Sequence, residues 1–107
     1  LISKGIEEFQ EIESSMDQID IKDKSLVFNT DLVEALELHN LMAQSKVTLH
    51  SAINRTESRG AHAREDYKER DDKNWLKHSF AFKNGDSVKL EYKDVELGNY
   101  EPKERKY

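Results

Sequence analysis

Apolar residues at the start of the chain recur every three or four positions. Within 1–19, six residues keep this spacing: Ile2, Ile6, Phe9, Ile12, Met16 and Ile19. Such a stripe is typical of one face of an amphipathic helix, so the pattern predicts a first helix over 1–19. A charged segment, 20–25, then breaks the period, and the short apolar run 26–28 leads to a second pattern.

The second pattern predicts a long helix from about Thr30 to about Ser58, a segment without proline or glycine. Asn29 or Thr30 can cap its N-terminus with a side-chain oxygen, and Gly60 is placed to end it. Its apolar face is too broad for one short partner helix, so we expect contacts on two sides, as in a bundle. The predicted antiparallel contacts join Phe9, Ile12 and Met16 to Leu38, Leu41, Met42 or Leu49.

Toward the C-terminus the apolar period changes from three or four residues to two, which is typical of strands. The alternation continues on both sides of Asn84-Gly85-Asp86 and therefore predicts a β-hairpin. Pairing Phe82 with Val88 and Phe80 with Leu90 keeps the apolar side chains on one face. That register requires a loop of three or five residues.

These elements predict a mainly α fold: an up-and-down helical bundle, a charged loop, a β-hairpin and an extended C-terminal tail. We divide the chain into a bundle part at 1–58, a charged loop segment at 59–78, and a hairpin with its tail at 79–107. The 107 residues are enough for one small domain or for part of a larger protein. The first residue is not methionine, which favours a fragment.

Composition narrows the function classes. Charged residues make up 36% of the chain against the ~25% typical of globular domains. The net charge is −5, so there is no general positive field to attract nucleic acid or an anionic membrane. The chain has no cysteine, which excludes disulfides and thiolate chemistry. No apolar run approaches the ~18–20 residues that span a bilayer, so we expect no direct membrane insertion.

The most heavily charged segment is 55–73, with six basic and six acidic residues and little apolar area. A balanced set of both signs suits ion pairs between segments better than a phosphate backbone, which requires net positive charge. Ser58, His62 and Asp66 could form a serine–histidine–acid set, but this spacing after a helix end is common by chance. A solvated charged loop is favoured over catalysis.

Metal and phosphate sites are not favoured either. His39 and His50 lie three helical turns apart, too far to share an ion, and no H-E-x-x-H motif accompanies His62 or His78. The glycines are isolated, so no phosphate loop is present. We therefore expect no catalytic, cofactor-binding or metal-binding residue in this chain.

The sequence of the charged loop, RTESRGAHAREDY at 55–67, closely resembles the C-terminal region of the flavoprotein subunit of succinate dehydrogenase and its relative fumarate reductase. The runs NTDL at 29–32, RDDKNWLKH at 70–78 and EPKERKY at 101–107 resemble the same family. The resemblance covers nearly the whole chain from about Lys22 onward. The runs EALEL at 34–38 and AREDY at 63–67 favour succinate dehydrogenase.

The resemblance implies an oxidoreductase of electron transport and the tricarboxylic acid cycle. In the intact enzyme, succinate is oxidised to fumarate at a covalently bound FAD, and electrons pass to an iron–sulfur subunit and on to quinone. The flavin, the dicarboxylate site and the proton-donating arginine lie in an N-terminal body outside this chain. The resemblance also implies a peripheral position on the cytoplasmic face of the inner membrane, or on the matrix side in mitochondria.

For this chain the resemblance implies a spectrin-repeat-like bundle of three helices, one of them truncated here, with a tail packed on the flavin-bearing body. Fumarate reductase, which runs the reverse reaction, and a stand-alone helical interaction module remain alternatives. Eight motif residues are expected to contact the flavin-bearing body: Arg55, Glu57, Ser58, Arg59, Gly60, His62, Arg64 and Asp66.

The expected contacts follow from side-chain chemistry. Guanidinium groups form bidentate hydrogen bonds with carboxylates, and Gly60 permits close backbone approach. Because the loop has no aliphatic residues, we expect it not to pack on its own bundle. Arg59 and Arg64 should then matter only in the full-length protein.

Overall fold

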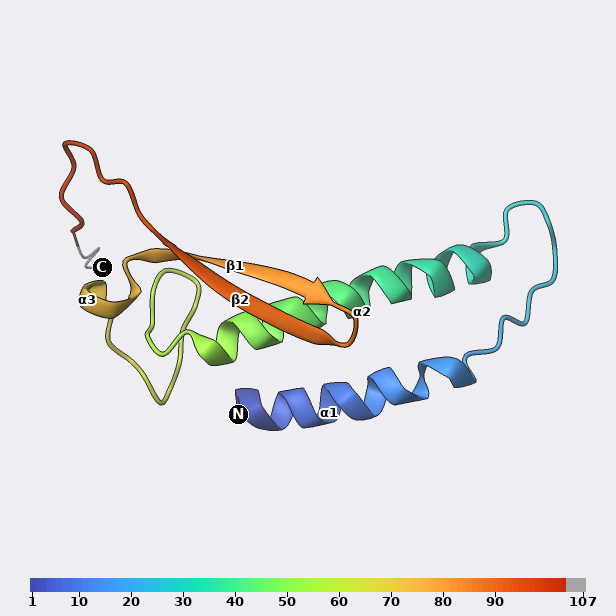
Figure 1. The fold of residues 1–107 in the computed structure, drawn as a ribbon. Coiled ribbons are helices and arrows are strands. Elements are labelled where there is room, and N and C mark those ends of the chain that lie inside the picture. Colours follow the sequence, from blue (N-terminus) through green and yellow to red (C-terminus); the bar gives the residue numbers. More distant parts are fainter. Residues whose placement is uncertain (104–107) are drawn as a thin grey trace.

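The computed structural model describes residues 1–103 as an elongated molecule of 58 × 32 × 30 Å (Figure 1). Two long helices lie side by side, and a β-hairpin lies along the second of them. The predicted combination of a helical region and a hairpin is therefore confirmed. The last four residues of the predicted hairpin-and-tail segment, 104–107, lie outside the described residues.

The elements follow one another as helix α1, the 3-10 turn η1, helix α2, the single-turn helix α3 and strands β1 and β2. Their bounds are Ile2–Ser15 for α1, Met16–Gln18 for η1, Thr30–Asn54 for α2, Asp72–Trp75 for α3, Lys77–Asn84 for β1 and Ser87–Asp94 for β2. The first predicted helix is confirmed over most of its length, and its last turn tightens into η1.

The long helix α2 begins as predicted but ends four residues early. Asn29 caps its N-terminus by accepting a hydrogen bond from a first-turn N–H at 2.9 Å. Its end at Asn54 makes the predicted end near Ser58 wrong. The backbone becomes extended at Arg55, and the Arg64 guanidinium binds the last carbonyls of the helix. A side chain from a later loop, and not a local glycine, ends the helix.

Packing between α1 and α2 is only partly as predicted. The helices are antiparallel (Figure 1), and Phe9 of α1 is buried. Ile12 and Leu41 were predicted to pack in the seam, but they are 57% and 61% exposed. The helices are also joined by an ion pair, in which the buried Lys46 donates to both carboxylate oxygens of Glu13 at 2.9 and 2.8 Å. The prediction is wrong for Ile12 and Leu41 because two helices alone leave this side open.

The hairpin forms with a register different from the predicted one. Its turn has two residues, Gly85-Asp86, so the predicted loop of three or five residues is wrong. Phe82 lies opposite Lys89, and Phe80 lies opposite Glu91. Gly85 occupies the first turn position with a φ of 57°, where two-residue hairpin turns favour glycine.

The two faces of the hairpin divide the apolar residues between them. Ala81, Val88 and Leu90 are half-buried, and the register places them on one face, which packs toward α2. Phe80 and Phe82 lie on the outer face, 44% and 49% exposed. The prediction failed because it assumed that all bulky apolar residues share one face, whereas the smaller side chains make the contact with α2.

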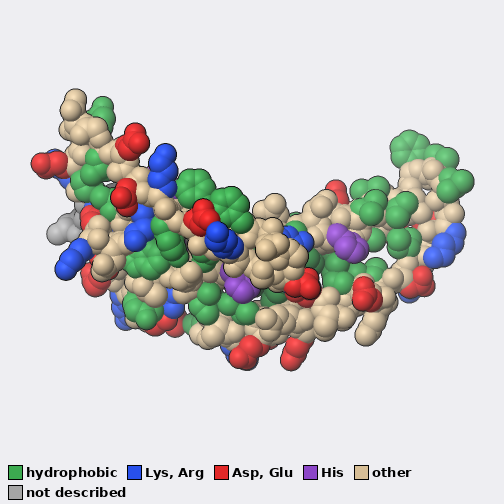
Figure 2. Space-filling view, viewed as in Figure 1, with side chains coloured by type: hydrophobic (Ala, Val, Ile, Leu, Met, Phe, Trp, Pro, Cys, Tyr) green, Lys and Arg blue, Asp and Glu red, His purple; other side chains and the backbone are tan. Residues whose placement is uncertain are grey.

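The chain has a very small apolar core. Among the described residues Phe9 is the one buried hydrophobic side chain, and green apolar side chains are spread over the surface in Figure 2. Within 1–103, no helix has the length and hydropathy that a membrane crossing requires.

Candidate functional site

The segment between α2 and β1 folds around one buried carboxylate. Glu57 is fully buried, and the Arg59 guanidinium donates to its two oxygens from Nε at 2.9 Å and Nη2 at 3.0 Å. The Asp71 N–H donates to the same carboxylate at 2.9 Å, and Arg55 Nη1 also donates to it. We call Arg55, Glu57, Arg59, Arg70 and Asp72 the Glu57 cluster.

Arg55 joins the end of α2 to the start of the hairpin. Its guanidinium donates to the carbonyl of Trp75 at 3.0 Å, the carbonyl of Lys77 at 2.7 Å and the hydroxyl of Ser79 at 3.1 Å. Its Cζ also lies 5.0 Å from the centre of the Trp75 ring, a cation–π contact. The Trp75 indole N–H donates to the Thr56 hydroxyl at 3.0 Å. One arginine therefore connects three parts of the chain.

Asp72 extends the cluster toward the C-terminal tail. It accepts from Arg59 Nη2 at 2.6 Å and from Arg70 Nε at 2.9 Å, both at Oδ1. Arg70 binds the second oxygen of Asp72 as well, and its Nη1 donates to the Lys103 carbonyl at 2.9 Å. The charges alternate along this path, so each guanidinium has a carboxylate partner.

A second network lies beside the cluster and is centred on Arg64, whose side chain is 7% exposed. Its Nη1 donates to the carbonyls of Ile53 at 2.7 Å, Arg55 at 3.2 Å and Ala52 at 3.3 Å. Carbonyls at a helix C-terminus lack intrahelical partners, so this guanidinium satisfies them. Its Nε donates to Asp66 at 2.8 Å.

The remaining predicted residues shape the loop itself. The Ser58 hydroxyl donates to the Tyr67 carbonyl at 2.7 Å and accepts from the Arg64 N–H at 2.8 Å. The His62 Nε2 lies 3.1 Å from the carbonyl that follows α2. Gly60 has a φ of 59°, and a Cβ built there would meet no atom of this chain within 4 Å. Its backbone conformation, and not close contact within the chain, therefore explains the glycine.

The charges of the cluster are strongly stabilised. Burial alone would raise the pKa of Glu57, but hydrogen bonds from Arg59, the Asp71 N–H and Arg55 outweigh it and hold the pKa below its ordinary value. Arg70, and then Arg59, lower the pKa of Asp72 to about 2. Both carboxylates are therefore ionised at neutral pH.

The structure brings the eight predicted residues together, but around partners within the chain. The expectation that the loop does not pack on its own bundle is wrong. The loop packs through hydrogen bonds and not through aliphatic contacts. Its arginines bind the buried Glu57 carboxylate and the carbonyls at the end of α2. Sequence reasoning did not select four further members of the site: Arg70, Asp71, Asp72 and Trp75. The run RDDKNW at 70–75 was the available signal, because its charges and indole complement the loop.

The arrangement does not form a hydrolytic or metal site. Ser58, His62 and Asp66 each bind other partners, so the possible serine–histidine–acid set is not assembled. Within residues 1–103, no group of three histidine or acidic side chains is placed to hold a metal ion.

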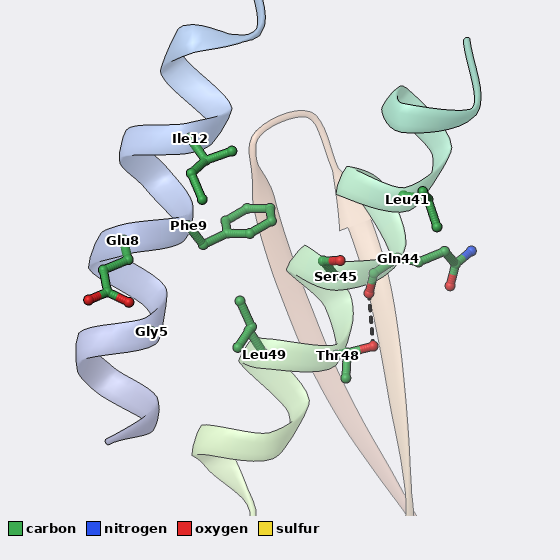
Figure 3. A pocket seen from close by; sticks show the side chains of 9 residues that line it. All are labelled: Gly5, Glu8, Phe9, Ile12, Leu41, Gln44, Ser45, Thr48 and Leu49. Carbon is green, nitrogen blue, oxygen red and sulfur yellow. Dashed lines mark hydrogen bonds between the residues drawn. The ribbon is translucent and has the colours of Figure 1, made fainter. Parts of the chain in front are cut away.

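An open groove runs between α1 and α2 (Figure 3). Its volume is about 520 Å³, and Phe9, Ile12, Leu41 and Leu49 supply its apolar lining. Figure 3 shows the Phe9 ring pointing across the groove toward α2, with Leu49 beside it. The other lining residues are small or polar: Gly5, Glu8, Gln44, Ser45 and Thr48.

Comparison with known proteins places this chain in a family of flavoproteins. The family model described as fumarate reductase flavoprotein C-term matches residues 1–107, so the chain belongs to that family. The resemblance inferred from the motifs is therefore confirmed.

Individual relatives include both enzymes of the family. The chain is 50% identical over 98 residues to the succinate dehydrogenase flavoprotein subunit of Rickettsia bellii, covering 91% of this chain and 16% of that protein. It is 41% identical over 114 residues to the mitochondrial succinate dehydrogenase [ubiquinone] flavoprotein subunit of Oryza sativa, covering 100% and 17%. It is 44% identical over 110 residues to the fumarate reductase flavoprotein subunit of Proteus vulgaris, covering 100% and 18%. The chain thus spans less than a fifth of these relatives.

Neither the groove between α1 and α2 nor the cavity beside Trp75 fits the FAD that the family implies. A dinucleotide diphosphate needs cations or clustered backbone N–H groups. The groove between α1 and α2 has no lysine or arginine in its lining. In the smaller cavity beside Trp75, the guanidinium groups of Arg55 and Arg59 are already bound to Glu57.

Proposed function

We propose that this chain is a supporting domain of a succinate dehydrogenase flavoprotein subunit. The intact enzyme oxidises succinate to fumarate with FAD and passes electrons to an iron–sulfur subunit. The observation that carries this proposal is the 50% identity to a succinate dehydrogenase flavoprotein subunit of which the chain covers 16%. The remainder of such a protein has room for the flavin and dicarboxylate sites.

The contacts of the charged loop support a structural role. The Glu57 cluster and the Arg64 network hold α2, α3, the hairpin and the tail in fixed relative positions. Asp66, whose side chain is 60% exposed, and Arg59, at 29%, still have accessible edges. We place the contacts with the flavin-bearing body at these edges, while the buried atoms keep the loop in shape.

The open groove supports the proposal that the domain is a three-helix bundle in the intact protein. Ile12 and Leu41 border the groove and are more than half exposed. A helix from the preceding part of the polypeptide, laid between α1 and α2, would bury both. The bundle part, the charged loop segment and the hairpin with its tail, at 1–58, 59–78 and 79–107, then form one C-terminal unit.

The cofactor, partners and location follow from the same proposal. FAD binds to the preceding body, and the iron–sulfur subunit accepts its electrons. The complex sits on the cytoplasmic face of the inner membrane, or on the matrix side in mitochondria, with this domain peripheral. Because the flavin and dicarboxylate sites lie in that body, we propose that the isolated chain is inactive.

Fumarate reductase is the second candidate, because relatives at 43% and 44% identity carry that name and match the chain over its whole length. The 50% identity to the Rickettsia bellii succinate dehydrogenase subunit favours the first candidate. A stand-alone helical module is less well supported, since the chain buries so little apolar surface by itself.

The test compares the full-length protein with the isolated chain. Flavin absorbance and succinate-dependent reduction of an artificial electron acceptor should be present in the full-length protein and absent from the chain. Fumarate reduction by a reduced viologen, measured beside it, should be slower. Stoichiometric flavin in the isolated chain would overturn the proposal, and faster fumarate reduction would favour the second candidate.

A further inference from the structure

Three consecutive apolar residues form an exposed tip at one end of the molecule. Leu26, Val27 and Phe28 are 100%, 71% and 96% exposed. They lie in the connection between η1 and α2, at the opposite end of the molecule from α3 (Figure 1). Apolar side chains gather at that end in Figure 2. Contiguous exposed apolar side chains mark interaction sites more often than single ones.

The tip is held in shape by side-chain hydrogen bonds. The Asn29 Nδ2 donates to the carbonyls of Asp23 at 2.9 Å and Ser25 at 3.0 Å, while its Oδ1 caps α2. The Asp23 carboxylate accepts from the Ser25 N–H at 2.8 Å. Asp31 of α2 accepts from the Asp23 N–H at 3.2 Å. A single asparagine thus fixes the tip to the start of α2.

The backbone of Phe28 is strained for a residue of its type. Its φ is 52°, a region that bulky side chains rarely adopt. Strain of this kind persists where the surroundings impose it, and it is concentrated at functional sites. Because the Phe28 side chain is 96% exposed, its own packing contacts within the described chain do not offset the strain.

We infer that Leu26–Phe28 is an apolar plug that inserts into a pocket of the preceding part of the same polypeptide. This inference rests on the proposed function, in which the chain is one domain of a longer flavoprotein. The chain covers 16–18% of its relatives, and a protein of their length would have most of its polypeptide outside this structure. A covalently linked surface is also present at high effective concentration.

The charges around the plug favour a protein pocket over a lipid surface. Lys22 and Lys24 flank it on one side, but Asp20, Asp23 and Asp31 lie close by, and Lys24 is paired with Asp20 at 3.5 Å. Anionic lipid headgroups attract clusters of basic residues, whereas here the acidic residues outnumber the basic ones.

Site-specific photo-crosslinking in the full-length holoenzyme tests this inference. A benzophenone amino acid replaces Phe28, and peptide mapping identifies the crosslinked residues. The expected partners are apolar residues that precede Leu1 in the same polypeptide. The same probe at Glu7, an exposed residue of α1, is the control for random capture. Crosslinks to the iron–sulfur subunit, to a second copy or to lipid, or no crosslink above the control, would overturn the inference.

Substitutions at the same residue provide a second readout. Phe28→Gly removes the backbone strain and the plug together. If the plug is inserted, this variant melts at a lower temperature than the wild-type holoenzyme, whereas Phe28→Leu stays close to wild type. An unchanged or higher melting temperature for Phe28→Gly would contradict insertion, because only relief of strain would remain. Flavin content and succinate oxidation are measured in parallel. A wild-type full-length protein that has neither would reject the proposed function and not the plug.

Discussion

The charged loop and the apolar groove differ in how far contacts within the chain bury their side chains. Glu57 has an exposure of 0% and accepts hydrogen bonds from three residues of its own chain. By contrast, Ile12 and Leu41 in the groove are 57% and 61% exposed. The Glu57 carboxylate therefore has its hydrogen-bond partners within the chain, while the apolar residues of the groove lack packing partners among the described residues.

Removing the central carboxylate should have the largest effect on the isolated chain. Glu57→Ala removes the fully buried carboxylate that the half-buried Arg55 and Arg59 share, and removing one partner of a buried ion pair costs about 3–5 kcal/mol. Urea denaturation followed by circular dichroism measures the change in unfolding free energy. The matched control is Glu65→Ala, an exposed acid in the same loop, expected within about 0.5 kcal/mol of wild type. Equal effects of the two variants would mean that the cluster does not stabilise the chain.

Leu41→Ala should destabilise the full-length protein more than the isolated chain. In the isolated chain the side chain is 61% exposed, so the loss should stay below about 1 kcal/mol. In the full-length protein, a helix that fills the groove would bury it, and the loss should rise to about 2–5 kcal/mol. Thermal unfolding of both forms gives the comparison. A large loss in the isolated chain, or none in either form, would contradict an open groove that is filled by the preceding polypeptide.

Arg59→Ala should have an intermediate effect that does not need the rest of the polypeptide. Its side chain is 29% exposed, and Glu57 keeps its bonds from Arg55 and Asp71. Loss of a hydrogen bond to a charged group costs about 1.5–3 kcal/mol. Urea denaturation of the isolated chain should detect it. If Arg59→Ala left the urea midpoint of the isolated chain unchanged but destabilised the full-length protein, Arg59 would act only in contacts between domains.

Lowering the pH should produce the most gradual effect. The folded pKa values of Asp72 and Glu57 lie below their ordinary values, so the unfolded chain binds more protons in acid. Their contribution is complete above the ordinary carboxyl pKa and is lost as the pH falls toward 2. Melting temperatures measured from pH 7 downward should therefore begin to fall near pH 4.5, the ordinary pKa of a glutamate side chain, and fall further below pH 3.8, that of an aspartate side chain. Asp72→Asn should flatten that fall, and an unchanged slope would exclude Asp72 as a contributor.

Local signals in the sequence predicted the elements better than their contacts. The Asn29 cap, the two helices and the hairpin all follow from nearby residues, and each is found. The end of α2 was not predictable locally, because Arg64 imposes it from nine residues beyond Arg55. The prediction of the hairpin register was wrong because the burial of Ala81, Val88 and Leu90 depends on how closely α2 approaches.

The candidate site shows the same division. The family motif selected eight loop residues, but it does not indicate where their hydrogen-bond partners lie. Charge counting suggested ion pairs, yet a balanced composition does not say whether those pairs form within the chain or across a domain boundary. The burial of Glu57 is a tertiary property. The run RDDKNW supplies the Asp71 N–H that binds Glu57 and the Asp72 carboxylate that binds Arg59.

Amide hydrogen exchange, measured on the isolated chain and on the full-length protein, tests most directly whether the charged loop is complete and the groove is not. The Asp71 N–H, which is bonded to Glu57, should be protected to a similar degree in both forms. Amides of α1 and of α2 around Leu41, which border the groove, should gain protection only in the full-length protein. Protection of Asp71 that appears only in the full-length protein, with equal exchange around Leu41 in both forms, would contradict the account.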